Sequence, residues 1–376
     1  RWRYWQRSSA PPDHHLLSAY REREMDTFFR REERRYRKKL ATYPHRHRQY
    51  FWQQFQFEEE QFTWQSHQGR APAGNFKEQE AALQQTFMAY KLRLACLRAA
   101  HQNISGEDCA IELLPEILAL AQRSPYADQP TISIYYQVYQ MQTGTGREAA
   151  FQQYQRLLRE HLAIFPPEEK RDLLLMGINF CVRRINEKGA IYLRQVLNLY
   201  RRGLDNELLL RHGWLSGFTF TNITIAAIGC GEYEWAANFV VDYRPQLPPG
   251  QRASIYALNA ARVAYASGAH RQALLLLHRF EDKDFFHQMS ARLLQLKVYF
   301  EGGDFQLLAA HLKNTRAYLR RQSRHPYHRK IYINILSLTE QLMKLPPYDH
   351  AKRKQLRKRI ETTEPLTERA WLLEQL

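Results

Sequence analysis

A short phrase that recurs at intervals in the mid-thirties constrains the fold of this chain more than any other feature. Each copy begins with a glycine, has an aromatic residue or histidine two positions later, and has Ala or Leu five positions after the glycine. The copies begin at Gly231, Gly268 and Gly303, so the glycines are 37 and 35 residues apart. Looser copies begin at Gly146 and Gly189. Such a period predicts an array of two-helix units that stack on one another.

The hydrophobic pattern between these glycines is helical. Ile255, Leu258, Ala261 and Tyr265 recur at three- and four-residue spacing, as the buried face of a helix does. Short Gly and Pro breaks leave segments of roughly 12 to 20 residues, a length suited to paired helices joined by tight turns. One segment, residues 131–139 (TISIYYQVY), is rich in strand-forming residues, although its flanks are helical. The sequence therefore predicts an all-α protein.

The chemistry of the phrase suits a turn between two paired helices. Glycine supports the left-handed backbone that such a turn often needs. The aromatic residue or histidine is expected to pack back on the first helix, and the small residue five positions after the glycine to let the two helices approach closely. Around residues 215–325 these units resemble tetratricopeptide repeats (TPRs), whose second helix opens with the same Gly, aromatic, Ala pattern. The resemblance implies a right-handed α-solenoid of antiparallel helix pairs.

The resemblance is weaker over residues 75–214, where the spacing drifts to about 40, and the usual closing proline is only partly kept, so the repeats are degenerate. The layout is also similar to a group of uncharacterised bacterial helical-repeat proteins that end in a tail like Trp371 to Leu376. That second resemblance implies an architecture and no activity.

Composition divides the chain into three parts. Residues 1–68 are predicted to form a basic, aromatic-rich helical region, and Gly69 to Gly74 (GRAPAG) to be a linker. Residues 75–346 are predicted to form the TPR-like array, and residues 347–376 a helical cap that is first basic and then acidic.

The net charge of +17 is concentrated near the two ends of the sequence. Residues 1–50 carry a net charge of +8 and residues 311–360 a net charge of +12, whereas residues 51–310 hold 26 basic and 26 acidic residues. A polyanion such as RNA or DNA, or an acidic protein, is one ligand for such basic regions. Solvated helices with local ion pairs, such as Glu33 with Arg37, are the alternative.

The candidate binding residues are the clustered cations of these two regions. In the first region they are Arg30, Arg31, Arg34 and Arg35. In the second they are Arg316, Arg320, Arg321, Arg324, Lys330, Lys352, Arg353, Arg357 and Lys358. The aromatic run from Tyr50 to Trp64 offers either a base-stacking platform or, more often for such a pattern, core or an interface.

Signals of enzymatic chemistry are weak. The chain has no glycine-rich phosphate loop, no H-E-x-x-H and no nucleophile elbow. Arg156-x4-His161 and Arg320-x4-His325 are similar to the Arg-x4–6-His element of HEPN-type ribonucleases, but the abundance of Arg makes chance matches common. We therefore expect no catalytic residues, no cofactor and no metal site.

The cysteines and the hydropathy indicate a compartment. The four cysteines are widely spaced, so buried reduced thiols and a cytoplasmic location are expected. No apolar run approaches the ~20 residues of a membrane helix, so no membrane insertion is expected.

The function predicted from the sequence is a non-catalytic scaffold or adaptor. It would bind a protein or peptide partner, or a larger complex, in the groove of the solenoid. The alternative is binding of RNA, a ribonucleoprotein or DNA through the two basic regions.

Overall fold

The chain is helical throughout the part that the structure describes. The structure is a computed structural model that describes residues 14–69, 74–105, 110–188, 190–278, 280–322, 326–346 and 348–376. Within these residues it contains eighteen α-helices and no strand, which confirms the all-α prediction. The ambiguous segment 131–139 lies in helix α7 (Pro130–Thr143). Its β-branched residues are buried among neighbouring helices, so tertiary packing overrides their local preference.

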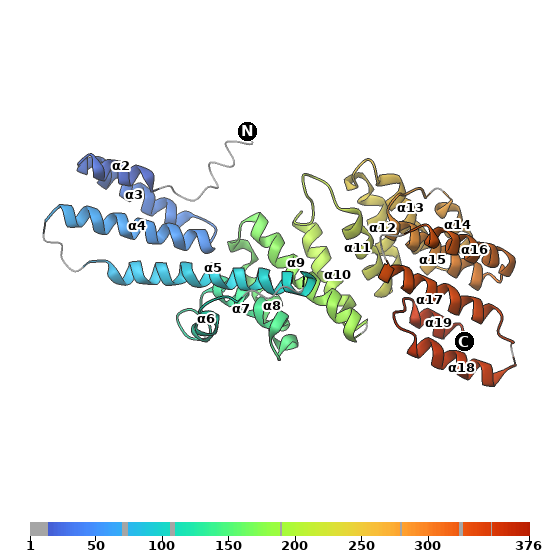
Figure 1. Cartoon of the computed structure of the whole chain (residues 1–376). Helices are drawn as coiled ribbons and strands as arrows, with labels where there is room; N and C mark the ends of the chain where they lie inside the picture. The colour runs from blue at the N-terminus through green and yellow to red at the C-terminus, as the bar shows by residue number, and fades with distance from the viewer. Residues whose placement is uncertain are drawn as a thin grey trace. The chain divides into compact units, whose positions relative to one another are not determined.

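The chain divides into two compact units, residues 1–208 and residues 209–376. The helices of the first unit are coloured from blue to green in Figure 1. They are α2 (His15–Glu22), α3 (Asp26–Thr42), α4 (Arg48–His67), α5 (Phe76–Ser105), α6 (Leu114–Leu120), α7, α8 (Arg147–His161), α9 (Pro167–Lys188) and α10 (Leu193–Asp205). The domain boundaries near residues 68 and 346, which were predicted from composition, remain predictions.

Stacked aromatic rings form the core of helices α2 to α4. Phe29 stacks on Trp64 with ring centroids 4.8 Å apart, and Tyr36 stacks on Phe57 at 4.9 Å. Phe29, Tyr36 and Phe57 are fully buried. Within the run from Tyr50 to Trp64, Phe51 and Phe57 are buried core residues, whereas Trp52 is 40% exposed, so the run is core only in part.

A buried carboxylate joins the start of α4 to α7 and α9. Glu169 on α9 is 2% exposed. It accepts hydrogen bonds from His47 Nδ1 at 3.1 Å, from Arg48 Nη1 at 2.9 Å and from the Tyr135 hydroxyl. Burial alone would raise the pKa of Glu169, but the hydrogen bonds from His47 and Tyr135 and the charge of Arg48 lower it. This cluster ties the N-terminal helices to the rest of their unit.

The second unit consists of helices coloured from yellow to red in Figure 1. They are α11 (Gly217–Gly229), α12 (Tyr233–Asp242), α13 (Arg252–Ala266), α14 (His270–Leu277), α15 (Phe285–Glu301), α16 (Phe305–Arg320), α17 (Pro326–Met343), α18 (His350–Thr362) and α19 (Arg369–Glu374). Helix α11 packs on α12 and α13, and α13 packs on α14 and α15. Each pair of helices therefore contacts the next pair along the chain.

The repeated phrase marks three turns of the same geometry. Gly231, Gly268 and Gly303 have φ values of +75°, +78° and +73°, which confirms the predicted left-handed turn. In each turn the residue after the glycine donates its backbone N–H to the carbonyl five positions earlier, as Ala269 does to Ala264 at 2.8 Å. This hydrogen bond closes the first helix of the pair.

The other positions of the phrase also behave largely as predicted. The second helix of each pair begins at the aromatic residue or histidine, and His270 stacks on Tyr265 of the preceding helix with centroids 5.4 Å apart. Ala236, Ala273 and Leu308, five positions after the glycines, are fully buried, although Leu308 is larger than the small residue predicted there. The looser copy at Gly146 lacks the left-handed backbone, with φ of −91°, and Gly189 lies outside the described residues.

Replacing Glu169 with Gln should destabilise the first unit by about 3 kcal/mol at pH 7, because Arg48 loses its buried counter-charge. A carboxylate whose pKa is lowered by folding stabilises the protein above its unfolded pKa, and this contribution is lost as the pH falls through the folded pKa. The difference in unfolding free energy between the variant and the natural protein should therefore shrink as the pH falls below 4.5, the ordinary pKa of a glutamate side chain. Urea unfolding at several pH values measures it, and Glu160→Gln on an exposed side chain is the control.

Replacing Gly268 with Ala should destabilise the second unit by about 1 kcal/mol, because a Cβ disfavours a left-handed backbone. A Cβ at Gly268 would meet no atom within 4 Å, so the cost is conformational and not steric. Gly250→Ala is the matched control, since that glycine also has open space and its φ is not in the left-handed region. Equal unfolding midpoints for the two variants would contradict this role.

Candidate functional site

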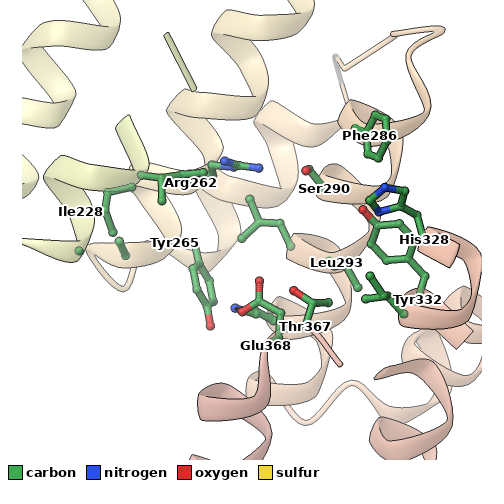
Figure 2. Close-up of a pocket in the computed structure, with 16 residues that line it drawn as sticks. Ile228, Arg262, Tyr265, Phe286, Ser290, Leu293, His328, Tyr332, Thr367 and Glu368 are labelled. Atoms are coloured by element: carbon green, nitrogen blue, oxygen red, sulfur yellow. Dashed lines mark hydrogen bonds and ion pairs between the residues drawn. The ribbon is translucent and has the colours of Figure 1, made fainter. Parts of the chain in front are cut away.

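A pocket of about 640 Å³ lies in the second unit. Its walls come from α11, α13, α15 and α17, the first helix of each pair, and from the segment that precedes α19. Figure 2 shows Phe286, His328 and Tyr332 gathered on the side formed by α15 and α17, with Thr367 and Glu368 below them. The pocket thus joins residues from four successive pairs of helices.

Among the described residues that line this pocket, Arg262 is a cation with no ion pair. Its side chain extends from α13 into the pocket (Figure 2), and its Nη1 atom is inaccessible to solvent without a hydrogen-bond partner. The residue as a whole is half-buried. No ion pair of Arg262 is found within the described part of the chain. Burial lowers the pKa of Arg262 to about 10, against the opposing effect of Glu368, so the guanidinium stays charged at neutral pH.

Lys297 and Glu368, two other charged residues that line the pocket, are paired with each other. Lys297 Nζ donates to Glu368 Oε2 at 2.5 Å. The Tyr265 hydroxyl donates to Glu301 Oε1 at 2.5 Å, and burial together with this contact raises the pKa of Tyr265. Arg262 is therefore left as the cation available to a ligand.

The remaining wall is apolar. Ile228, Leu293, Ile331 and Leu294 line it together with the aromatic rings. Ile225 also lines the pocket and is 46% exposed, so an apolar edge faces solvent. A pocket that combines an unpaired guanidinium with aliphatic and aromatic walls is suited to an anionic group attached to an apolar one.

The predicted N-terminal cations lie exposed on α3, and several make local contacts. Arg30 lies 5.2 Å from the centroid of the Trp64 ring, and Arg35 lies 3.4 Å from Glu32. Arg34 donates to the backbone carbonyl of Arg30 at 3.4 Å, whereas Arg31 is simply exposed. The predicted pair of Glu33 with Arg37 is present at 3.0 Å.

The predicted C-terminal cations are distributed over α16, α17 and α18. Arg316 donates to Glu340 at 2.5 Å, Lys352 pairs with Asp349 at 2.9 Å, and Arg353 donates to the backbone carbonyl of Leu376. Of the predicted cations, six are exposed: Arg320, Arg321, Lys330, Lys352, Arg357 and Lys358. Arg324 lies outside the described residues. The N-terminal and C-terminal cations thus belong to different compact units.

The sequence did not single out Arg262, because it lies where basic and acidic residues balance. One signal was present: Arg262 follows Ile255 by seven positions and Leu258 by four, which places it on the buried face of its helix. An arginine on an apolar face is rare unless it is paired or functional.

The other candidate chemistries gain little from the structure. Arg156 is exposed on α8, and His161 at the end of that helix lies 3.7 Å from Glu160; His325 lies outside the described residues. No group of three metal-binding side chains occurs among the residues described. Cys96 and Cys181 are buried free thiols, and Cys230 is half-buried. None of the helices, as far as they are described, has the length and apolarity needed to cross a membrane.

Comparison with known proteins does not assign a family. No protein-family model matches the chain, and no curated protein matches it either.

Replacing Arg262 with Met should stabilise the second unit by about 1 kcal/mol, because a half-buried cation without an ion pair is exchanged for an apolar side chain of similar length. Urea unfolding monitored by tryptophan fluorescence measures the change. A loss of stability of similar size would mean that Arg262 is a structural residue, and it would remove Arg262 as a ligand-binding group.

Proposed function

We propose that this protein is a non-catalytic adaptor that binds a peptide segment of a protein partner in the pocket around Arg262. In this proposal the helix pairs form a right-handed, TPR-like solenoid, and the first helices of the pairs line its groove. An acidic side chain or a carboxylate of the partner pairs with Arg262, and a neighbouring apolar side chain packs against the walls of the pocket. The proposed location is the cytoplasm.

The unpaired guanidinium of Arg262 carries the proposal. A half-buried charge without an ion-pair partner is costly, and a ligand carboxylate that accepts the missing hydrogen bond from Nη1 recovers part of that cost on binding. The neighbouring ion pair of Lys297 with Glu368 keeps a second cation of the pocket neutralised. Recognition of one acidic group is therefore favoured over recognition of a highly charged polyanion at this pocket.

The position of the pocket supports a peptide as the ligand. Helices α11, α13 and α15 contact one another in order, and all of them contribute to the wall. A groove that runs over several helix pairs is suited to an extended chain that places successive side chains against successive pairs.

RNA, ribonucleoprotein or DNA binding through the basic regions is the second candidate. The observation that favours it is the solvent face of α18, where Lys354, Arg357 and Lys358 are exposed. Replacing these three residues with Gln should weaken binding to a generic RNA and reduce its salt dependence. An affinity for RNA that does not change with salt concentration would contradict this candidate.

Selection from a random peptide library displayed on phage tests the first proposal. Peptides that combine Asp or Glu with an adjacent aliphatic or aromatic residue should be enriched on the full chain. Arg262→Gln should weaken a selected peptide by about tenfold or more, because a charge-assisted hydrogen bond is lost. Arg271→Gln, at an exposed position on α14, is the matched control and should leave affinity unchanged. Equal binding to both variants would contradict the proposal.

A further inference from the structure

A second hollow, of about 450 Å³, lies in the first unit and has a different chemistry. It is formed by α8 and α10 and is lined by three arginines, Arg159, Arg194 and Arg202. Side-chain amides of Gln155, Gln195 and Asn198 complete its polar lining, and Leu199 is its apolar member among the described residues.

The arginines of this hollow carry like charges into one space. The pKa of Arg202 is lowered, first by burial and then by the positive charge of Arg159. No described acidic residue lines the hollow. The guanidiniums of Arg159 and Arg202 therefore repel each other, and an anion placed between them would reduce this repulsion.

The shape of the hollow favours a chain of anionic groups over a single anion. Gln195 and Arg202, which both line the hollow, are seven residues apart on α10, which corresponds to about 10 Å along the helix. Arginine forms paired hydrogen bonds to phosphate oxygens, and the amides add donors between the two ends. Since the described lining has no aromatic ring, the hollow offers no surface for stacking bases.

We propose that the hollow between α8 and α10 binds an extended phosphate chain, either inorganic polyphosphate or the backbone of a single-stranded RNA. Arg159 and Arg202 contact the phosphates directly, and Gln155, Gln195 and Asn198 hold the chain along the helix. Recognition is independent of base sequence because only phosphates are contacted. The site is separate from the pocket around Arg262 and does not depend on its function.

Fluorescence anisotropy with the full chain tests this site. One probe is a labelled twelve-nucleotide poly-U RNA, and inorganic polyphosphate and polyglutamate of similar length serve as competitors. The double variant Arg159→Gln/Arg202→Gln should weaken binding of the phosphate chains by about tenfold or more. The double variant Arg123→Gln/Arg156→Gln removes the same charge at two exposed positions outside the hollow, and it should change affinity less than about twofold.

The outcomes separate the ligand sources and the alternatives. If RNA binds weakly and polyphosphate competes with it, polyphosphate is the ligand. If RNA binds tightly and this binding depends on Arg159 and Arg202, RNA is the ligand. Equal weakening by the two double variants would show a diffuse basic surface and overturn the site. Competition by polyglutamate as strong as that by polyphosphate, or no binding of either phosphate chain, would also overturn it. Unchanged thermal unfolding of each variant verifies that the fold is retained.

Discussion

A left-handed glycine at the end of one helix determines how the second unit is built. At Gly231, Gly268 and Gly303 the positive φ lets the first helix close with a hydrogen bond to the fifth preceding carbonyl, and the next helix begins two residues after the glycine. Because the same turn recurs, α11, α13 and α15 occupy equivalent places in successive pairs. The pocket around Arg262 depends on this regularity, since its walls come from those equivalent helices and from α17.

The first unit is held together differently. Its N-terminal helices pack through stacked aromatic rings, and its polar centre is Glu169 with partners from α7 and the start of α4. Glu169 is a buried charge with its hydrogen bonds complete, so it specifies one packing of these elements. Arg262 in the second unit has no such partners, and for that reason it is the stronger candidate for binding.

Some of the cations near the C-terminal end of the sequence are engaged within their own unit. Arg316 and Lys352 are engaged by acidic residues of their own unit, and Arg353 by a backbone carbonyl. In contrast, the arginines of the α8 and α10 hollow come from the part of the sequence in which basic and acidic residues balance. A balanced count does not exclude a local excess of one sign, because folding decides which charges meet.

The sequence by itself determined the local features of this protein. The helical period of Ile255 to Tyr265 and the left-handed turns at the three glycines follow from interactions within a few residues, so they were predictable. The sites were not, because they bring together side chains from distant positions, such as Ile225 with Glu368 in one pocket. Only the tertiary structure decided that Glu169 is fully partnered and Arg262 is not, because the partners of a buried charge come from whichever helices pack around it.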